Sequence, residues 1–167
     1  MKAPTHITGG ITAGLIYLKA AQSSDFGLAP LGVLTCAGCL ALAVGGSLIP
    51  DLDTKTSKAG HAAAPASATI SFFFGHRTVL HGPLLYIALY ILAVQSAPII
   101  QPFAFSFLLG ILSHIWLDML NPRGVPLLYP VPAKFHTVDI PTGGFAEYLV
   151  LSVLAALNLY IIIHFII

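Results

Sequence analysis

Long apolar stretches constrain the fold of this chain more than any other feature of its sequence. Residues 28–49, 102–120 and 145–167 are almost uninterrupted in hydrophobic character. Each has the length of about 20 residues that a helix needs to cross a bilayer. Only 8% of the chain is charged and 57% is hydrophobic, whereas about 25% of the residues in a soluble domain are charged. We therefore predict an all-α integral membrane protein with a single domain, residues 1–167.

Two weaker apolar segments extend the predicted topology to five transmembrane helices. Residues 83–100 begin with Pro83, and proline suits the first position of a helix. Residues 7–21 are short and rich in glycine, which favours close helix packing over lipid contact. Residues 59–75 fit either a complete span or a re-entrant or interfacial helix. With a re-entrant or interfacial helix there, the chain is a polytopic protein of about five spans; a complete span stays the open alternative.

Five spans separate the ionisable residues between the two sides of the membrane. One side receives six of the seven lysine and arginine residues. Basic residues favour the cytoplasmic side, so this polar side is predicted to face the cytoplasm. It holds His6, Asp51, Asp53, His61, His76, His81, Asp118, His136 and Asp139.

Two function classes find little support in the composition. The net charge of +1 provides no concentrated basic face of the kind that binds nucleic acid. Cys36 and Cys39 could form a redox pair or half of a zinc site, but no second cysteine pair exists. We interpret them as small packing residues in an apolar helix.

A histidine and an aspartate four residues apart, His114 and Asp118, end one of the apolar stretches. Positions i and i+4 share a helix face, so the imidazole and the carboxylate point in the same direction. A carboxylate buried in a membrane helix needs a partner. A hydrogen bond between the two side chains would meet that need without a metal ion; a metal site is the functional alternative.

Further imidazoles and carboxylates lie near the other predicted helix ends. Pro50-Asp51-Leu52-Asp53 could simply end a helix, and His76-Arg77-Thr78-Val79-Leu80-His81 could be a polar linker. Taken together, imidazoles and carboxylates without thiolates suit zinc, manganese or iron(II). The candidate ligands are too numerous for one tetrahedral ion, so a dinuclear site is an open alternative to a single ion.

In order and spacing, these blocks resemble the YdjM family, whose members are described as membrane-bound, metal-dependent hydrolases. The resemblance runs from residue 6 to about residue 150. It rests on His6 before a glycine-rich helix, residues 46–53 (GSLIPDLD), 76–81 (HRTVLH), 112–118 (LSHIWLD), 121–130 and 142–147. The chain departs from the family pattern at Asn121, near which the family usually has threonine, and at Gly82, where it prefers serine. Family membership implies a metal-dependent hydrolase in a bacterial inner membrane.

Residue roles follow from the motifs and the resemblance together. Asp53 would bridge metal ions or accept a proton from water. Arg77 would hold an anionic group of the substrate or anchor the chain at lipid headgroups. Glu147 would act in catalysis or support the site, although an acid at a helix start is favourable without any function. The predicted metal ligands are His6, Asp51, Asp53, His76, His81, His114 and Asp118.

The predicted function is hydrolysis of an ester or phosphoester by a membrane enzyme with one or two zinc or manganese ions. A looser similarity to zinc-dependent phospholipase C suggests phosphoesters as the substrate class. The substrate would be an anionic, amphipathic or lipid-linked molecule that reaches the site from the membrane, with membrane lipids as the surrounding partners. The alternatives are an ion or metal transporter and a non-catalytic membrane scaffold with a structural metal.

Overall fold

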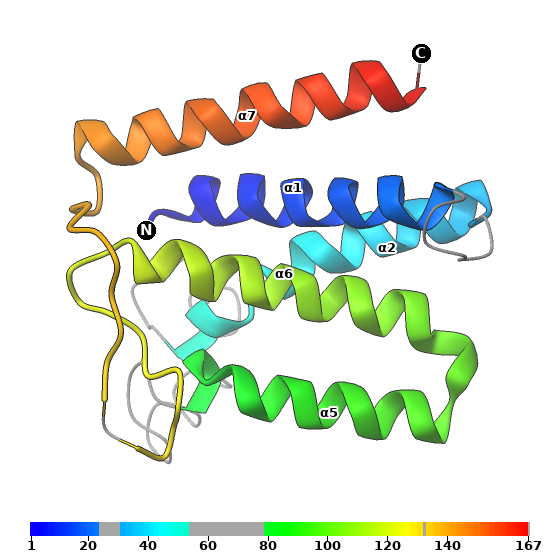
Figure 1. Ribbon diagram of the computed structural model, residues 1–167, viewed down its shortest axis with the longest axis horizontal. Helices are drawn as coiled ribbons and strands as arrows, with labels where there is room; N and C mark the ends of the chain where they lie inside the picture. Colours follow the sequence, from blue (N-terminus) through cyan, green and yellow to red (C-terminus); the bar gives the residue numbers. More distant parts are fainter. Residues whose placement is uncertain (24–30, 54–78, 132, 167) are drawn as a thin grey trace.

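The computed structural model describes residues 1–23, 31–53, 79–131 and 133–166 (Figure 1). Within these ranges the regular elements are all helical, which confirms the all-α prediction for this part of the chain. The α-helices are α1 (Ala3–Gln22), α2 (Val33–Gly46), α5 (Pro83–Ser96), α6 (Gln101–Met119) and α7 (Phe145–Ile166). Short 3₁₀ helices are η2 (Pro50–Asp53), η3 (Val79–His81) and η4 (Pro98–Ile100).

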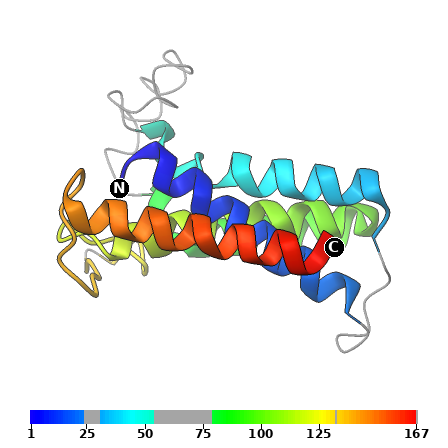
Figure 2. The same ribbon diagram turned by 90° about the horizontal axis from the view of Figure 1, so that it is seen from above.

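The five α-helices lie side by side and alternate in direction along the bundle (Figures 1 and 2). Helix α6 contacts α1, α2 and α5, while α7 packs on α1. The starts of α1, α5 and α7 lie at the same end of the bundle as the end of α6, and α2 runs towards this end (Figure 1). The elements η2 and η3 lie at that end too, so it collects the polar motifs of the sequence.

Two of the described helices are long and apolar enough to cross a membrane, namely α6 over Gln101–Met119 and α7 over Phe145–His164. Helices α2 and α5 are apolar but have only 14 residues each. The five-span topology is therefore supported by length and composition for two of its helices and stays a prediction for the others. Residues 59–75, the expected re-entrant or interfacial helix, lie outside the described residues.

Both short helices end earlier than the hydrophobic pattern predicts, and the local sequence explains why. Helix α2 stops at Gly46, and Ser47 and Leu48 form a turn in which Leu48 N donates to the Gly45 carbonyl. Helix α5 stops at Ser96 because Pro98 lacks a backbone N–H and disfavours helical geometry in the preceding residue. A hydropathy pattern alone does not predict either of these helix ends.

Helices α2 and α6 approach each other at glycine. A Cβ atom added to Gly46 would overlap the carbonyl oxygen of Phe107, and one added to Gly110 would overlap that of Ala43. Small residues of this kind allow backbones to pack closely in membrane helices. The contact fixes the end of α2, and with it the start of η2, against the middle of α6. His114 and Asp118 follow on the next turns of α6.

Candidate metal centre

The predicted pair on α6 is at the centre of a buried polar cluster. His114 and Asp118 are both fully buried. Their side chains lie one helical turn apart, with His114 Nε2 3.7 Å from Asp118 Oδ2. The prediction that they share a helix face is confirmed.

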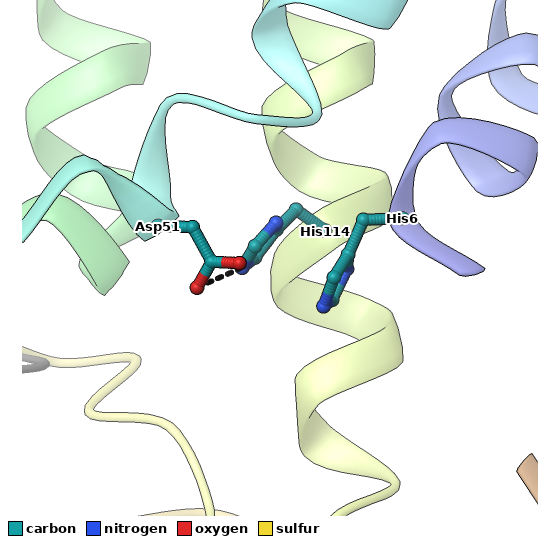
Figure 3. Close-up of side chains that lie close together, drawn as sticks. All are labelled: His6, Asp51 and His114. Carbon is teal, nitrogen blue, oxygen red and sulfur yellow. Dashed lines mark ion pairs between the residues drawn. The ribbon is translucent and has the colours of Figure 1, made fainter. Parts of the chain in front are cut away.

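Three other elements bring a side chain to this pair. His6 of α1 places its Nε2 3.3 Å from Asp118 Oδ1, and His81 of η3 places its Nε2 3.7 Å from Asp118 Oδ2. Asp51 of η2 places its Oδ1 3.9 Å from His114 Nε2 (Figure 3). Five of the seven predicted ligands thus lie close together in the structure. They come from four elements that are far apart in the sequence.

The remaining predicted site residues are not placed in this cluster by the described part of the chain. Asp53 is the last residue of η2, but its side chain lies outside the described residues. His61, His76 and Arg77 also lie outside them. The loop residues His136 and Asp139 are 3.9 Å apart and well exposed.

The backbone holds the His114 ring in a defined orientation. His114 Nδ1 lies 2.7 Å from the carbonyl oxygen of Ser47. A carbonyl oxygen only accepts hydrogen bonds, so Nδ1 carries the proton, and in a neutral ring Nε2 presents a lone pair. This nitrogen has no hydrogen bond among the described residues. It faces carboxylate oxygens of both Asp51 and Asp118.

A lone pair directed at two carboxylates is unfavourable unless a cation lies between them. Histidine ligands in metal sites commonly have this arrangement, in which one ring nitrogen donates to a backbone carbonyl and the other binds the metal. The His6 ring stacks on His114, with centroids 3.7 Å apart. Neither nitrogen of His6 has a hydrogen bond of acceptable geometry within the described residues. The donor set therefore fits a divalent cation.

Two overlapping groups could hold such an ion. One consists of His6, Asp51 and His114, and the other of His81, His114 and Asp118. Within each group the ligand atoms lie within 4.8 Å of one another. Because Nδ1 of His114 is bound to Ser47, only Nε2 is available for a metal, and both groups require it. The described residues can therefore use His114 for one ion at a time.

Burial and the α-ammonium group of Met1 both affect the charge of the carboxyl groups at this site. Burial raises the pKa of the Asp51 carboxyl, and the neighbouring imidazole of His6 opposes this shift. The α-ammonium group of Met1 donates to Asp118 Oδ1 over 2.6 Å. A bound metal ion would add to that positive charge and favour the ionised form of both carboxyl groups.

Two groups near the site, the Ser47 carbonyl and the Asn121 side chain, were not predicted from the sequence to support it. The Ser47 carbonyl that orients His114 has no sequence signature, since any residue has a backbone carbonyl. Asn121 was noted only within a motif, yet its buried side chain donates to the Ile140 carbonyl and to Thr142 Oγ1. It thereby closes the loop that leads to Glu147 at the start of α7.

Comparison with known proteins identifies relatives of this chain. The YdjM inner membrane protein family matches residues 1–166. The uncharacterized protein YvsG of Bacillus subtilis (strain 168) is 30% identical over 161 residues, which are 96% of this chain and 93% of that protein. The inner membrane protein YdjM of Escherichia coli (strain K12) is 36% identical over 129 residues, which are 74% of this chain and 60% of that protein.

The inner membrane protein YdjM of Shigella flexneri has the same identity and coverage as the Escherichia coli protein. The alignment thus spans less than two thirds of these two relatives. No solved structure matches the chain. The family match extends over nearly every residue, from the first turn of α1 to the end of α7, and so includes all five converging side chains. The chain belongs to the YdjM inner membrane protein family.

Proposed function

We propose that this protein is a membrane-bound, metal-dependent hydrolase that cleaves an ester or phosphoester bond in a lipid-linked substrate. The observation that carries the proposal is the orientation of His114. Its Nδ1 donates to Ser47, and its Nε2 faces the carboxylates of Asp51 and Asp118. A structural hydrogen-bond network would place a donor there, whereas a metal site requires this set of acceptors.

The ligands proposed for the ion are His6, His81 and His114 with the carboxylates of Asp51 and Asp118. When bound, a zinc or manganese ion supplies Lewis-acid chemistry, which polarises a carbonyl or phosphoryl oxygen and makes a water molecule more acidic. In hydrolysis the water oxygen bonds to the acyl carbon or phosphorus, the bond to the leaving oxygen breaks, and that oxygen takes up a proton. Asp53 as proton acceptor and Arg77 as anion-binding residue stay predictions.

An apolar cavity beside the metal ligands supports a substrate with a hydrocarbon chain. The cavity lies between α5 and α6 and has a volume of about 220 Å³. Its lining is Tyr86, Leu89, Tyr90, Ala93, Ala104, Phe107, Leu108 and Ile111. Pockets for compact ligands usually have volumes of about 300–1,000 Å³, so this smaller cavity suits one chain of a lipid.

Two residues that line the cavity lie near the polar cluster, one on α6 and one at the start of α5. Ile111 lies three residues before His114, so the two side chains are about one turn apart. The hydroxyl of Tyr86 donates to the carbonyl of Leu80, which directly precedes His81. An ester or phosphate group at the metal ligands would therefore have its hydrocarbon chain beside it.

A membrane location is supported by the family and by the apolar helices α6 and α7. We further propose five spans in a bacterial inner membrane, with the metal centre at the cytoplasmic face. This orientation rests on the six basic residues predicted for the polar side. Labelling of single cysteines introduced at Lys2 and Lys19 in intact cells would test it, because the two positions should differ in accessibility.

The decisive experiment compares metal content and hydrolysis in wild type, His114→Ala and His136→Ala. His136 is a matched control because it is an exposed histidine in a loop. We expect zinc or manganese to copurify with wild type and His136→Ala but not with His114→Ala, and hydrolysis of ester or phosphoester lipids to follow metal content. Wild-type protein that binds no metal after reconstitution would exclude this function.

A metal transporter is the second candidate, and one observation favours it. The two ligand groups share His114, so an ion could pass from one group to the other without leaving the protein. Metal uptake into proteoliposomes, measured beside lipid hydrolysis, distinguishes the two functions. Uptake that His114→Ala abolishes, in protein without hydrolytic activity, would favour transport.

A further inference from the structure

Helix α1, which carries His6, begins at a residue that cannot cap it. The first backbone N–H groups of a helix lack acceptors within the helix, and Ser, Thr, Asp or Asn commonly supplies one from the position before it. Here that position is Lys2, whose side chain makes no capping hydrogen bond. The start of α1 therefore needs an acceptor from elsewhere in the protein.

Glu147 of α7 supplies this acceptor. Its Oε1 accepts hydrogen bonds from the backbone N–H of Lys2 over 2.5 Å and from Thr5 Oγ1 over 2.9 Å. In a capping box, a glutamate three residues into a helix accepts the N–H of that helix's own capping residue. Here the glutamate comes from a different helix. Its negative charge also lies at the positive end of the α1 dipole.

The same carboxylate orders the start of its own helix. Glu147 Oε2 accepts a hydrogen bond from the backbone N–H of Gly143 over 2.5 Å. Gly143 has a φ of +81°, a conformation that L side chains rarely adopt. One side chain, 2% exposed, thus fixes the turn before α7, the start of α7 and the start of α1, which are adjacent in Figure 1.

The capped segment leads directly to a proposed metal ligand. Thr5 precedes His6, and both are buried. The His6 ring lies flat against His114 at the site, with 13° between the ring planes. A change at the first turn of α1 would move this ring relative to Asp51 and Asp118.

We propose that Glu147 is a positioning residue that caps α1 from across the bundle and thereby holds His6 in the metal centre. This inference rests on the proposed function for the role of His6 as a ligand. Of the two roles predicted from the sequence, catalysis or support of the site, it favours support, because three donors already bind the two oxygens of Glu147. A positioning residue changes how the metal is held, whereas a catalytic residue changes only turnover.

The test uses Co²⁺ as a spectroscopic probe in Glu147→Gln, Thr5→Val and His6→Ala, each purified as full-length protein in detergent. Asp139→Asn is the control, since it removes an exposed carboxylate from a loop. We expect Glu147→Gln to weaken Co²⁺ binding about 10- to 100-fold, the usual effect of losing a group that orients a ligand. Its visible spectrum should shift towards that of His6→Ala. Thr5→Val, which removes one donor and keeps the carboxylate, should shift both readouts less and in the same direction.

Hydrogen exchange of residues 2–8 provides a second readout that needs no metal. Glu147→Gln should speed exchange there, while Asp139→Asn should leave it unchanged. Wild-type affinity and spectrum in Glu147→Gln, together with lost hydrolysis, would overturn the positioning role in favour of catalysis. Wild-type protein that binds no Co²⁺ would refute the proposed function instead. The cap would then be upheld or overturned by the exchange rates alone.

Discussion

The imidazole rings of His6 and His114 lie face to face, with centroids 3.7 Å apart and planes 13° from parallel. Two protonated imidazoles could not stay in this arrangement without strong repulsion, because both rings are buried and charges interact strongly away from water. The stacking therefore disfavours a charge on both rings at once. Histidine binds a metal through a neutral ring, so the geometry is compatible with the proposed role of His6 and His114 as ligands.

Metal affinity should fall as the pH is lowered. Protons compete with the metal for imidazole nitrogens, whose ordinary pKa is about 6.5. The raised pKa of Asp51 acts in the same direction, because this carboxyl takes up a proton at higher pH than an exposed aspartate. Titration calorimetry with Zn²⁺ between pH 8 and pH 5 would measure the loss. An affinity that is constant over this range would argue against histidine ligands.

One metal ion per chain is the expected stoichiometry. Both ligand groups need the same nitrogen of His114, so loading one group should exclude the other. Elemental mass spectrometry on wild type and Asp51→Asn would count the ions, and we expect about one in wild type and fewer in the variant. A ratio of two in wild type would mean that residues beyond the five described ligands complete a second site.

Filling the cavity between α5 and α6 should separate binding of a hydrocarbon chain from binding of a head group. Ala104→Phe places a ring in the cavity, and Leu92→Phe, at a position that is 61% exposed, is the matched control. We expect Ala104→Phe to bind dodecyl phosphate at least about tenfold more weakly, a cost of about 1.4 kcal/mol. Binding of inorganic phosphate to the metal-loaded protein should not change. Equal losses for both ligands would count against the cavity as a chain-binding site.

Two adjacent glycines at the end of α2 should respond in opposite ways to alanine. A Cβ atom on Gly46 overlaps the Phe107 carbonyl, whereas one on Gly45 meets nothing within 4 Å. Gly46→Ala should cost about 1–3 kcal/mol through overpacking, and Gly45→Ala should be neutral or stabilising because alanine favours helix. Thermal unfolding in detergent would compare them. Equal melting temperatures would mean that α2 and α6 can separate at little cost.

The sequence predicted those features of the site that depend on local periodicity. The spacing of His114 and Asp118 fixes their common face because both lie in one helix. The convergence of His6, Asp51 and His81 followed from placing each at the same side of a multi-span protein. The cap of α1 by Glu147 could not be predicted, because it joins positions at opposite ends of the chain. The early ends of α2 and α5 were missed because a hydropathy pattern contains no information on the backbone geometry of glycine and proline.

The glycine contact between α2 and α6 also influences the spacing of the proposed metal ligands Asp51 and His114. Asp51 follows the end of α2 by five residues, while His114 follows Gly110 by four on α6. Sliding one helix along the other by a single residue would move Asp51 by about 1.5 Å relative to His114. That displacement exceeds the difference between the bond lengths that zinc and calcium prefer. The register of α2 on α6 would therefore affect which ion the proposed centre prefers, although the glycine contact lies away from the proposed ligands.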